Sequence, residues 1–231
     1  MNKSLLFALA LLLTSTFSWA QREHHVDFMY GYGTKNSSIS GHIVKNFKLL
    51  KNEKLHVGVG GRAFYFYGGT TLYTTGPNKH AQYSERVDTL SLDKPSIITA
   101  NLSLNAKYLI TPKLAVGFSF DLAGFSFGKK KYATFYPGKA AQETTPPGTV
   151  TFGNQIRPSA NALFLTGNYS KGSLCSEFFI RYTPIERFSI KAGYSIFSTE
   201  YSSTKRIGYK DNYRFRNTSG QIVFGLGYNF I

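Results

Sequence analysis

The chain has 231 residues and a formal net charge of +15, with 16 tyrosines, 20 phenylalanines and 22 glycines. Cys175 is its single cysteine, which excludes an internal disulfide, and no GxGxxG, P-loop or CxxC motif supports nucleotide binding or a structural zinc site. The basic charge favours anionic partners, which for an exported protein are lipid phosphates or acidic glycans before nucleic acid.

Residues 1–20 have the organisation of a secretory signal peptide. Lys3 supplies the positive n-region, 5–13 form the apolar h-region, and Ser18-Trp19-Ala20 is a small-x-small cleavage site. The apolar run is about half of the roughly 20 residues that a spanning helix needs. We therefore expect an exported chain whose mature part, 21–231, is one domain without a transmembrane helix or a lipid anchor.

The mature chain contains about eight segments in which apolar and polar residues alternate with the period of a β-strand. In chain order these predicted strands are 26–33, 39–48, 55–65, 96–108, 114–123, 176–182, 188–196 and 220–231. Short polar turns follow the second, fourth and sixth strands, whereas 68–94, 128–158 and 199–219 are predicted as long loops. Residues 161–169 alternate only in part, so a count of ten strands that also uses part of 132–137 stays open.

The last twelve residues show the clearest alternation. One side carries Ile222, Phe224, Leu226, Tyr228 and Phe230, and the other side is small or polar. A strand in this position needs a neighbour on each edge, which closure against the first strand supplies. The segment resembles the closing strand of bacterial outer-membrane β-barrels, which the barrel-assembly machinery reads, although here Phe230 is penultimate.

The whole mature chain resembles the small eight-stranded outer-membrane barrels of the OmpA-like transmembrane or OmpX type. The resemblance implies an all-β fold, namely a closed antiparallel transmembrane barrel of about eight strands with short periplasmic turns and long extracellular loops. It also implies a location in the Gram-negative outer membrane, in contact with lipid and lipopolysaccharide. A soluble or lipocalin-like barrel is the alternative.

The polar faces of the strands indicate which side is the interior. They combine charged residues with glycine and serine, which would make room for long side chains inside a narrow barrel. The charged residues expected to pair there as an ionic plug are Asp27, Arg62, Lys107, Asp121, Glu177, Arg181 and Lys191. An interior of eight strands is just wide enough for side chains to fill, which argues against a channel.

Motifs for catalysis or metal binding are weak. None of the five histidines is followed two residues later by serine, and no Asp-x-His pair occurs, so lipid hydrolases and omptin-type proteases find no support. His42 and His56 are interpreted as hydrogen-bonded interior residues. His24 and His25, which are adjacent in a strand, point opposite ways, so we expect no metal and no cofactor.

The long loops are basic. The main candidates for contact with lipopolysaccharide phosphates or anionic glycans are Lys129, Lys130, Lys131, Lys205 and Arg206. Arg214 and Arg216 fall in the predicted loop 199–219 and belong to the same basic set. Solvated loops are the alternative interpretation. The sequence thus predicts an integral outer-membrane barrel with a structural or surface-interaction role and no catalysis. Other hypotheses are an envelope assembly or secretion accessory barrel, a narrow porin and a lipid-modifying enzyme.

Overall fold

The computed structural model describes residues 22–49, 53–77, 81, 83–139, 150–165, 170–204, 207 and 212–230. Within these residues no helix has the length and apolar character needed to cross a bilayer. The predicted signal peptide lies outside the described residues.

One antiparallel sheet of thirteen strands accounts for most of the described chain. The elements are β1 (Arg22–Tyr32), β2 (Asn36–Lys48), β3 (Leu55–Gly68), β4 (Thr71–Thr75), the 3-10 helix η1 (Ser84–Arg86), β5 (Thr89–Leu92), β6 (Ser96–Thr111), β7 (Leu114–Phe127), β8 (Lys131–Tyr136), β9 (Val150–Pro158), β10 (Asn161–Leu163), β11 (Leu174–Ile185), β12 (Phe188–Ser203) and β13 (Arg214–Phe230). Each of the predicted strands falls on one of the longer of these strands.

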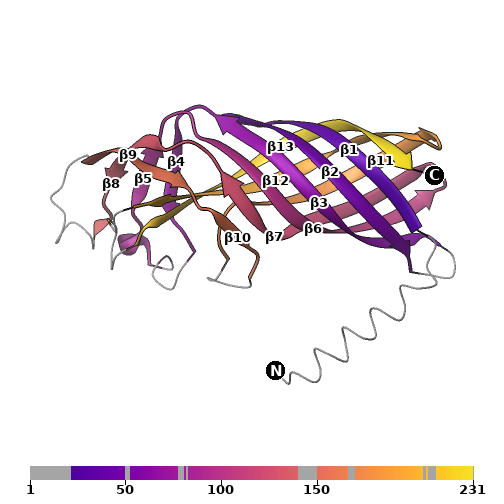
Figure 1. Cartoon of the computed structure of the whole chain (residues 1–231), viewed down its shortest axis with the longest axis horizontal. Coiled ribbons are helices and arrows are strands. Elements are labelled where there is room, and N and C mark those ends of the chain that lie inside the picture. Colours follow the sequence, from indigo (N-terminus) through magenta and orange to yellow (C-terminus); the bar gives the residue numbers. More distant parts are fainter. Residues whose placement is uncertain are drawn as a thin grey trace, which may run out of the picture.

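Eight long strands form a closed ring in the order β1, β2, β3, β6, β7, β11, β12 and β13 (Figure 1). The last strand closes against the first, with His24 opposite Phe230 and Tyr32 opposite Ile222. This pairing leaves neither end strand with a free edge, as the alternation of the C-terminal segment predicted. We call this ring the barrel.

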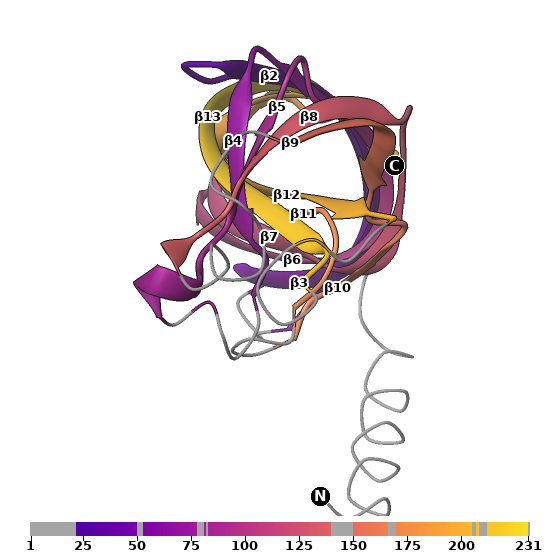
Figure 2. The same cartoon turned by 90° about the vertical axis from the view of Figure 1, so that its left-hand side faces the viewer.

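Four short strands form a second ring with the ends of two barrel strands. β4, β5, β8 and β9 pair in this order between the outer parts of β13 and β12, which also pair with each other (Figure 2). We call this ring, with 199–203 of β12 and 214–218 of β13, the crown. It lies at the end of the barrel opposite the C-terminus (Figure 1).

The crown corrects the prediction of about eight strands and three long loops. The stretch 68–94 contains β4 and β5, and 128–158 contains β8 and β9. The predicted loop 199–219 is mostly strand, because β12 continues to Ser203 and β13 begins at Arg214. Of the undecided stretch 161–169, the structure describes 161–165, and this part contains β10, which pairs with Ala123–Phe125 of β7 at the edge of the ring.

Short connections gather at the other end of the barrel, which we call the turn end. There β6 joins β7 through 112–113 and β11 joins β12 through 186–187. At the crown end, the β1–β2 connection, 33–35, joins two barrel strands directly, whereas β3 leads to β6, and β7 to β11, through strands of the crown. This one-sided distribution is the one that the sequence predicted, with the crown taking the place of the long loops.

Candidate functional site

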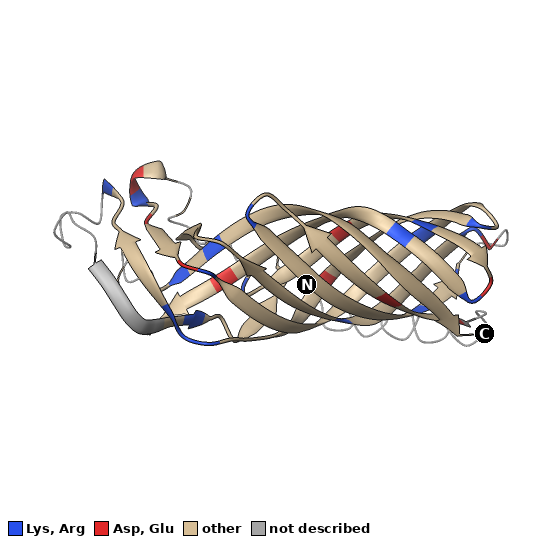
Figure 3. Cartoon of the chain, turned by 90° about the horizontal axis from the view of Figure 1, so that it is seen from above, with Lys and Arg blue, Asp and Glu red and all other residues tan. Residues whose placement is uncertain are grey.

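The barrel has its polar residues inside and its apolar residues outside. Asp27 and Lys191 are 0% exposed, whereas Phe28, next to Asp27 in β1, is 68% exposed. The same alternation holds in β13, where Gln221 is 1% and Ile222 54% exposed. Basic and acidic residues lie together on the barrel strands (Figure 3).

Six of the seven charged residues predicted for the interior form one chain of ion pairs. Arg181 donates from Nη2 to both carboxylate oxygens of Asp27, at 2.8 and 2.6 Å. Lys191 links Asp27, at 3.3 Å, to Glu177. Arg62 then links Glu177, at 3.9 Å, to Asp121, at 3.5 Å. We call these six residues the ion network; its three basic and three acidic groups balance in formal charge.

Neutral groups hold the ion network in place. Asp121 accepts hydrogen bonds from the Asn101 amide at 2.7 Å and from the backbone N–H of Cys175 at 2.9 Å. Arg181 donates to Ser189 Oγ at 3.0 Å. Because buried charges are costly without such partners, these bonds are what makes the network tolerable inside the barrel.

Interior glycines make the space for these side chains. Gly227 lies opposite Asp27 in the β1–β13 pair. A Cβ at this position would lie 2.5 Å from Asp27 Oδ1 and 3.1 Å from Arg181 Nη1. The small face of the C-terminal strand is therefore a steric requirement of the Asp27–Arg181 pair.

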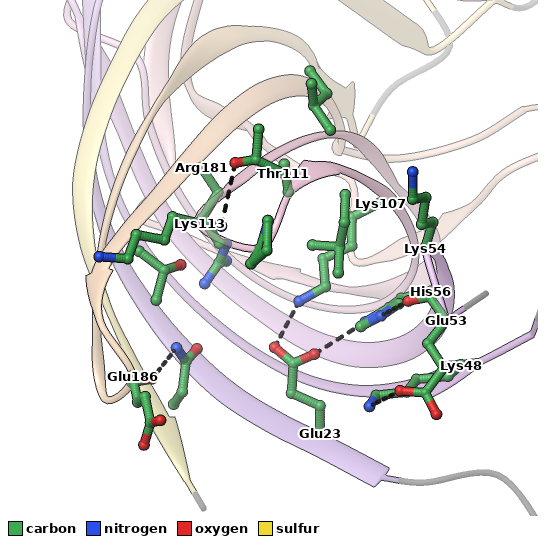
Figure 4. A pocket seen from close by; sticks show the side chains of 16 residues that line it. Glu23, Lys48, Glu53, Lys54, His56, Lys107, Thr111, Lys113, Arg181 and Glu186 are labelled. Atoms are coloured by element: carbon green, nitrogen blue, oxygen red, sulfur yellow. Dashed lines mark hydrogen bonds and ion pairs between the residues drawn. The ribbon is translucent and has the colours of Figure 1, made fainter.

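Lys107, the seventh predicted residue, lies outside the ion network. Its ammonium donates to Glu23 Oε1 at 2.6 Å, and the other oxygen of Glu23 lies 3.0 Å from His56 Nδ1 (Figure 4). These residues line a cavity of about 510 Å³ at the turn end, which we call the vestibule. Sequence reasoning missed Glu23 as a partner because the residue precedes the first clear alternation.

Apolar layers follow the ion network toward the crown. Phe64, Phe66, Cys175 and Phe197 form one buried cluster in the barrel. A second cluster fills the crown and includes Tyr73, Phe135, Tyr201 and Phe215. The crown therefore has an apolar core of its own beyond the polar interior of the barrel.

Two tyrosines tie this crown core to the strands around it. Tyr201 donates from its hydroxyl to the carbonyl of Ser96 at 3.0 Å. The Tyr73 hydroxyl lies 3.1 Å from Thr199 Oγ1, and burial raises the pKa of this phenol above its ordinary value.

Two arginines assigned to a basic loop are instead part of a buried cluster. Arg214 donates from Nη2, and Arg216 from Nη2, to Oε2 of Glu200, both at 2.8 Å, and Glu200 is 1% exposed. Arg216 also donates to Ser170 Oγ at 2.6 Å. Both residues lie in β13 and share the buried Glu200 carboxylate, so the prediction that they belong to a long loop is wrong.

The remaining basic residues of the predicted loops lie at the crown end. Lys129 and Lys130 are exposed between β7 and β8, and Lys131 is half-buried as the first residue of β8. Lys205 and Arg206 lie outside the described residues. The exposed basic residues at this end that the structure describes are Lys35, Lys94, Lys129, Lys130, Lys139, Arg157 and Lys171, and the exposed acidic ones are Glu85 and Asp93.

His42 and Ser103 form a histidine–serine pair in the interior, although the sequence has no His-x-Ser motif. His42 Nε2 lies 2.7 Å from Ser103 Oγ, across strands that are distant in sequence. Among the described residues His42 Nδ1 has no hydrogen-bond partner, so the pair lacks the third group that orients a catalytic histidine. Both side chains are buried beside the ion network. His24 is exposed and His25 buried, on opposite faces of β1, and the described chain brings no three metal-ligating side chains together.

No protein-family model and no curated protein matches the sequence. Among solved structures, the chain is similar to a major outer-membrane protein of Thermus thermophilus, with 12% identity, a TM-score of 0.41, and 90% of this chain and 99% of that chain covered. It is also similar to Ail of Yersinia pestis, with 13% identity, a TM-score of 0.39, and 91% and 100% covered. The N-terminal barrel of Pseudomonas aeruginosa OprF gives 13% identity, a TM-score of 0.34, and 91% and 99% covered. These structural neighbours are small outer-membrane β-barrels, and likeness at this level says nothing about function.

Proposed function

We propose that the protein is an integral outer-membrane barrel, closed to ions, that carries the crown at the cell surface as a structural and surface-interaction element. The crown end then faces outward, and the turn end faces the periplasm. The proposal assigns no catalysis, and it makes β13 the strand that the barrel-assembly machinery reads.

One observation carries the membrane location, namely the inside-out distribution of side chains around the closed ring. Burial of apolar surface is worth about 25 cal/mol per Å². A soluble protein with outward residues such as Phe28, Ile43 and Leu226, which are 64–68% exposed, would forgo that stabilisation around its whole wall. Lipid contact supplies it, and the ring satisfies the backbone without water.

The ion network supports a closed interior. Its six residues are at most 3% exposed, come from five of the eight barrel strands, and are neutral in sum. Beyond it lie the cluster of Phe64, Phe66, Cys175 and Phe197, which we call the aromatic layer, and the apolar core of the crown. An ion crossing the barrel would have to displace these contacts.

The exposed charge of the crown end supports contact with anionic molecules. Seven basic residues face solvent there against two acidic ones among the described residues. We propose that the ligands are phosphate groups of lipopolysaccharide, to which each charge near the surface contributes about 1 kcal/mol. The double variant Lys129→Gln/Lys130→Gln, which removes two such charges, should lower the affinity for lipopolysaccharide about thirtyfold. Lys54→Gln/Lys113→Gln, which removes the same charge at the turn end, should leave it unchanged.

The membrane location is tested by fractionating cells and running the membrane fraction on SDS gels, unboiled and boiled. A closed barrel keeps its backbone hydrogen bonds in SDS until it is heated, so we expect an outer-membrane protein whose mobility changes on boiling. Recovery in the soluble periplasm without a mobility change would reject the proposal. Stepwise conductance of the refolded protein in planar bilayers would instead favour a narrow porin.

A further inference from the structure

The vestibule is the one large hollow at the turn end that the described residues line, and the ion network does not fill it. Its walls come from β1, β2, β3, β6, β7, β11 and β13, together with the short turns. Arg181, at the near end of the ion network, also lines the vestibule. A molecule can therefore enter from the turn end and stops at the ion network.

The two walls of the vestibule differ in chemistry. One wall carries the charged group formed by Glu23, His56 and Lys107 (Figure 4). The tip of the β6–β7 hairpin, residues 109–115, supplies the other wall, where Leu109, Ile110, Pro112 and Ala115 lie beside Thr111 and Lys113. This arrangement suits a ligand that has a charged group beside an apolar body.

The charge of the lining favours an anion. Five basic residues, Lys48, Lys54, Lys107, Lys113 and Arg181, face three glutamates, Glu23, Glu53 and Glu186. Lys48 pairs with Glu53 and Lys107 with Glu23, both at 2.6 Å. Within the described part of the chain, the ammonium of Lys113 makes no ion pair, and the residue is exposed at the rim.

Two buried polar atoms of the lining lack partners. Among the described residues, Nε of Arg181 is a donor without an acceptor, and Oδ1 of Asn229 is an acceptor without a donor. Arg181 is 2% exposed. Native structures seldom leave such groups unsatisfied. A peptide C-terminus combines a carboxylate, which suits the basic residues of the lining, with N–H groups and an apolar last side chain, which suits the apolar residues of the β6–β7 turn.

We propose that the vestibule binds the C-terminal end of a periplasmic peptide, with its carboxylate among Lys107, Lys113 and Arg181 and its last side chain on the β6–β7 wall. This inference rests on the proposed function, because that function places the turn end in the periplasm. The vestibule thereby gives the barrel a partner site on the side opposite the crown.

The test measures binding of a fluorescent tetrapeptide, Ala-Gly-Ala-Leu, to the full mature chain refolded in detergent. We expect binding of the free acid and at least about tenfold weaker binding of its C-terminal amide, because the amide loses the charge. Lys113→Gln should weaken binding about two- to fivefold, the range of an exposed ion pair. Lys130→Gln, which removes the same charge at the crown end, should leave the affinity for the peptide unchanged. Ala115→Leu, which fills the apolar wall, should weaken binding while the protein keeps its heat-dependent mobility.

Equal binding of acid and amide, equal effects of K113Q and K130Q, or no binding to the unmodified chain would each overturn the proposal. Tight binding of N-acetyl-leucine would also overturn it in favour of a small free acid. Orientation is tested separately with K113C and a membrane-impermeant maleimide on intact cells, since the native Cys175 is buried. Labelling from outside would reject the proposed function while leaving the binding result in detergent intact.

Discussion

At the scale of single residues, Lys191 is the centre of the barrel interior. It is 0% exposed and joins Asp27 to Glu177, and its ammonium also lies 4.2 Å from the centre of the Phe179 ring. Both carboxylates keep a second cation, Arg181 and Arg62 respectively. The lysine is therefore the link between two arginine–carboxylate pairs.

Replacing this link should leave two buried carboxylates undercompensated. We predict that Lys191→Met lowers the free energy of unfolding by about 3–5 kcal/mol, the range for removal of one partner of a buried pair. Urea titration of the protein refolded in lipid vesicles measures this change. Adding Glu177→Gln to Lys191→Met should recover part of the loss, whereas an unchanged midpoint for the single variant would show that the network contributes nothing.

Two glycines offer a matched test of packing inside and outside the wall. A Cβ at Gly227 meets Asp27 and Ser189, whereas a Cβ at the exposed Gly61 has no atom within 4 Å. We expect Gly227→Ala to destabilise by about 1–3 kcal/mol through overpacking. Gly61→Ala should be neutral or stabilising by up to about 1 kcal/mol. The same urea titration measures the stability of both variants. Equal effects of Gly227→Ala and Gly61→Ala would contradict the assignment of Gly227 to a packed interior.

Sequence alternation predicted which of the charged residues point inward, because charges such as Asp27, Asp121 and Lys191 each sit between two outward apolar neighbours. It did not predict which charges meet. Lys107 pairs with Glu23, which is 84 residues away in sequence, and Arg214 pairs with Glu200 through the register of β12 and β13. Period and spacing within one strand contain no information on that register.

At the scale of elements, β12 and β13 each belong to two rings. The inner part of β12 pairs with β11, and its outer part, Tyr201–Ser203, pairs with Pro158–Ile156 of β9. Likewise, the C-terminal part of β13 pairs with β1, and its residues Phe215 and Arg216 pair with β4. The crown was missed because its strands have four to nine residues, and a strand such as β5 shows only two inward residues, Leu90 and Leu92.

The two rings have separate cores, so they should lose structure separately. Phe135 is 0% exposed and packs edge-on against Phe215 in the crown. Phe135→Ala should cost the crown about 3–5 kcal/mol and expose it to protease added outside cells. The heat-dependent gel mobility of the barrel should persist. Loss of that mobility, or unchanged resistance to protease, would show that barrel and crown are not independent.

At the scale of the whole molecule, four layers follow one another along the barrel axis. The vestibule is succeeded by the ion network, the aromatic layer and the apolar core of the crown. Around them, the barrel wall presents apolar side chains outward on every strand. Such a molecule is stable only where its wall meets lipid, so the membrane location is the claim on which the other proposals depend.

The most direct measurement of this claim is a nitroxide scan of β13 from residue 221 to 226 in lipid vesicles, with molecular oxygen and a water-soluble nickel chelate as relaxation agents. We predict high oxygen accessibility at Ile222, Phe224 and Leu226 and low accessibility to both agents at Gln221 and Val223. High accessibility of Phe224 and Leu226 to the nickel chelate would place the wall in water. That result would contradict the membrane barrel, and with it the assignment of the crown to the cell surface.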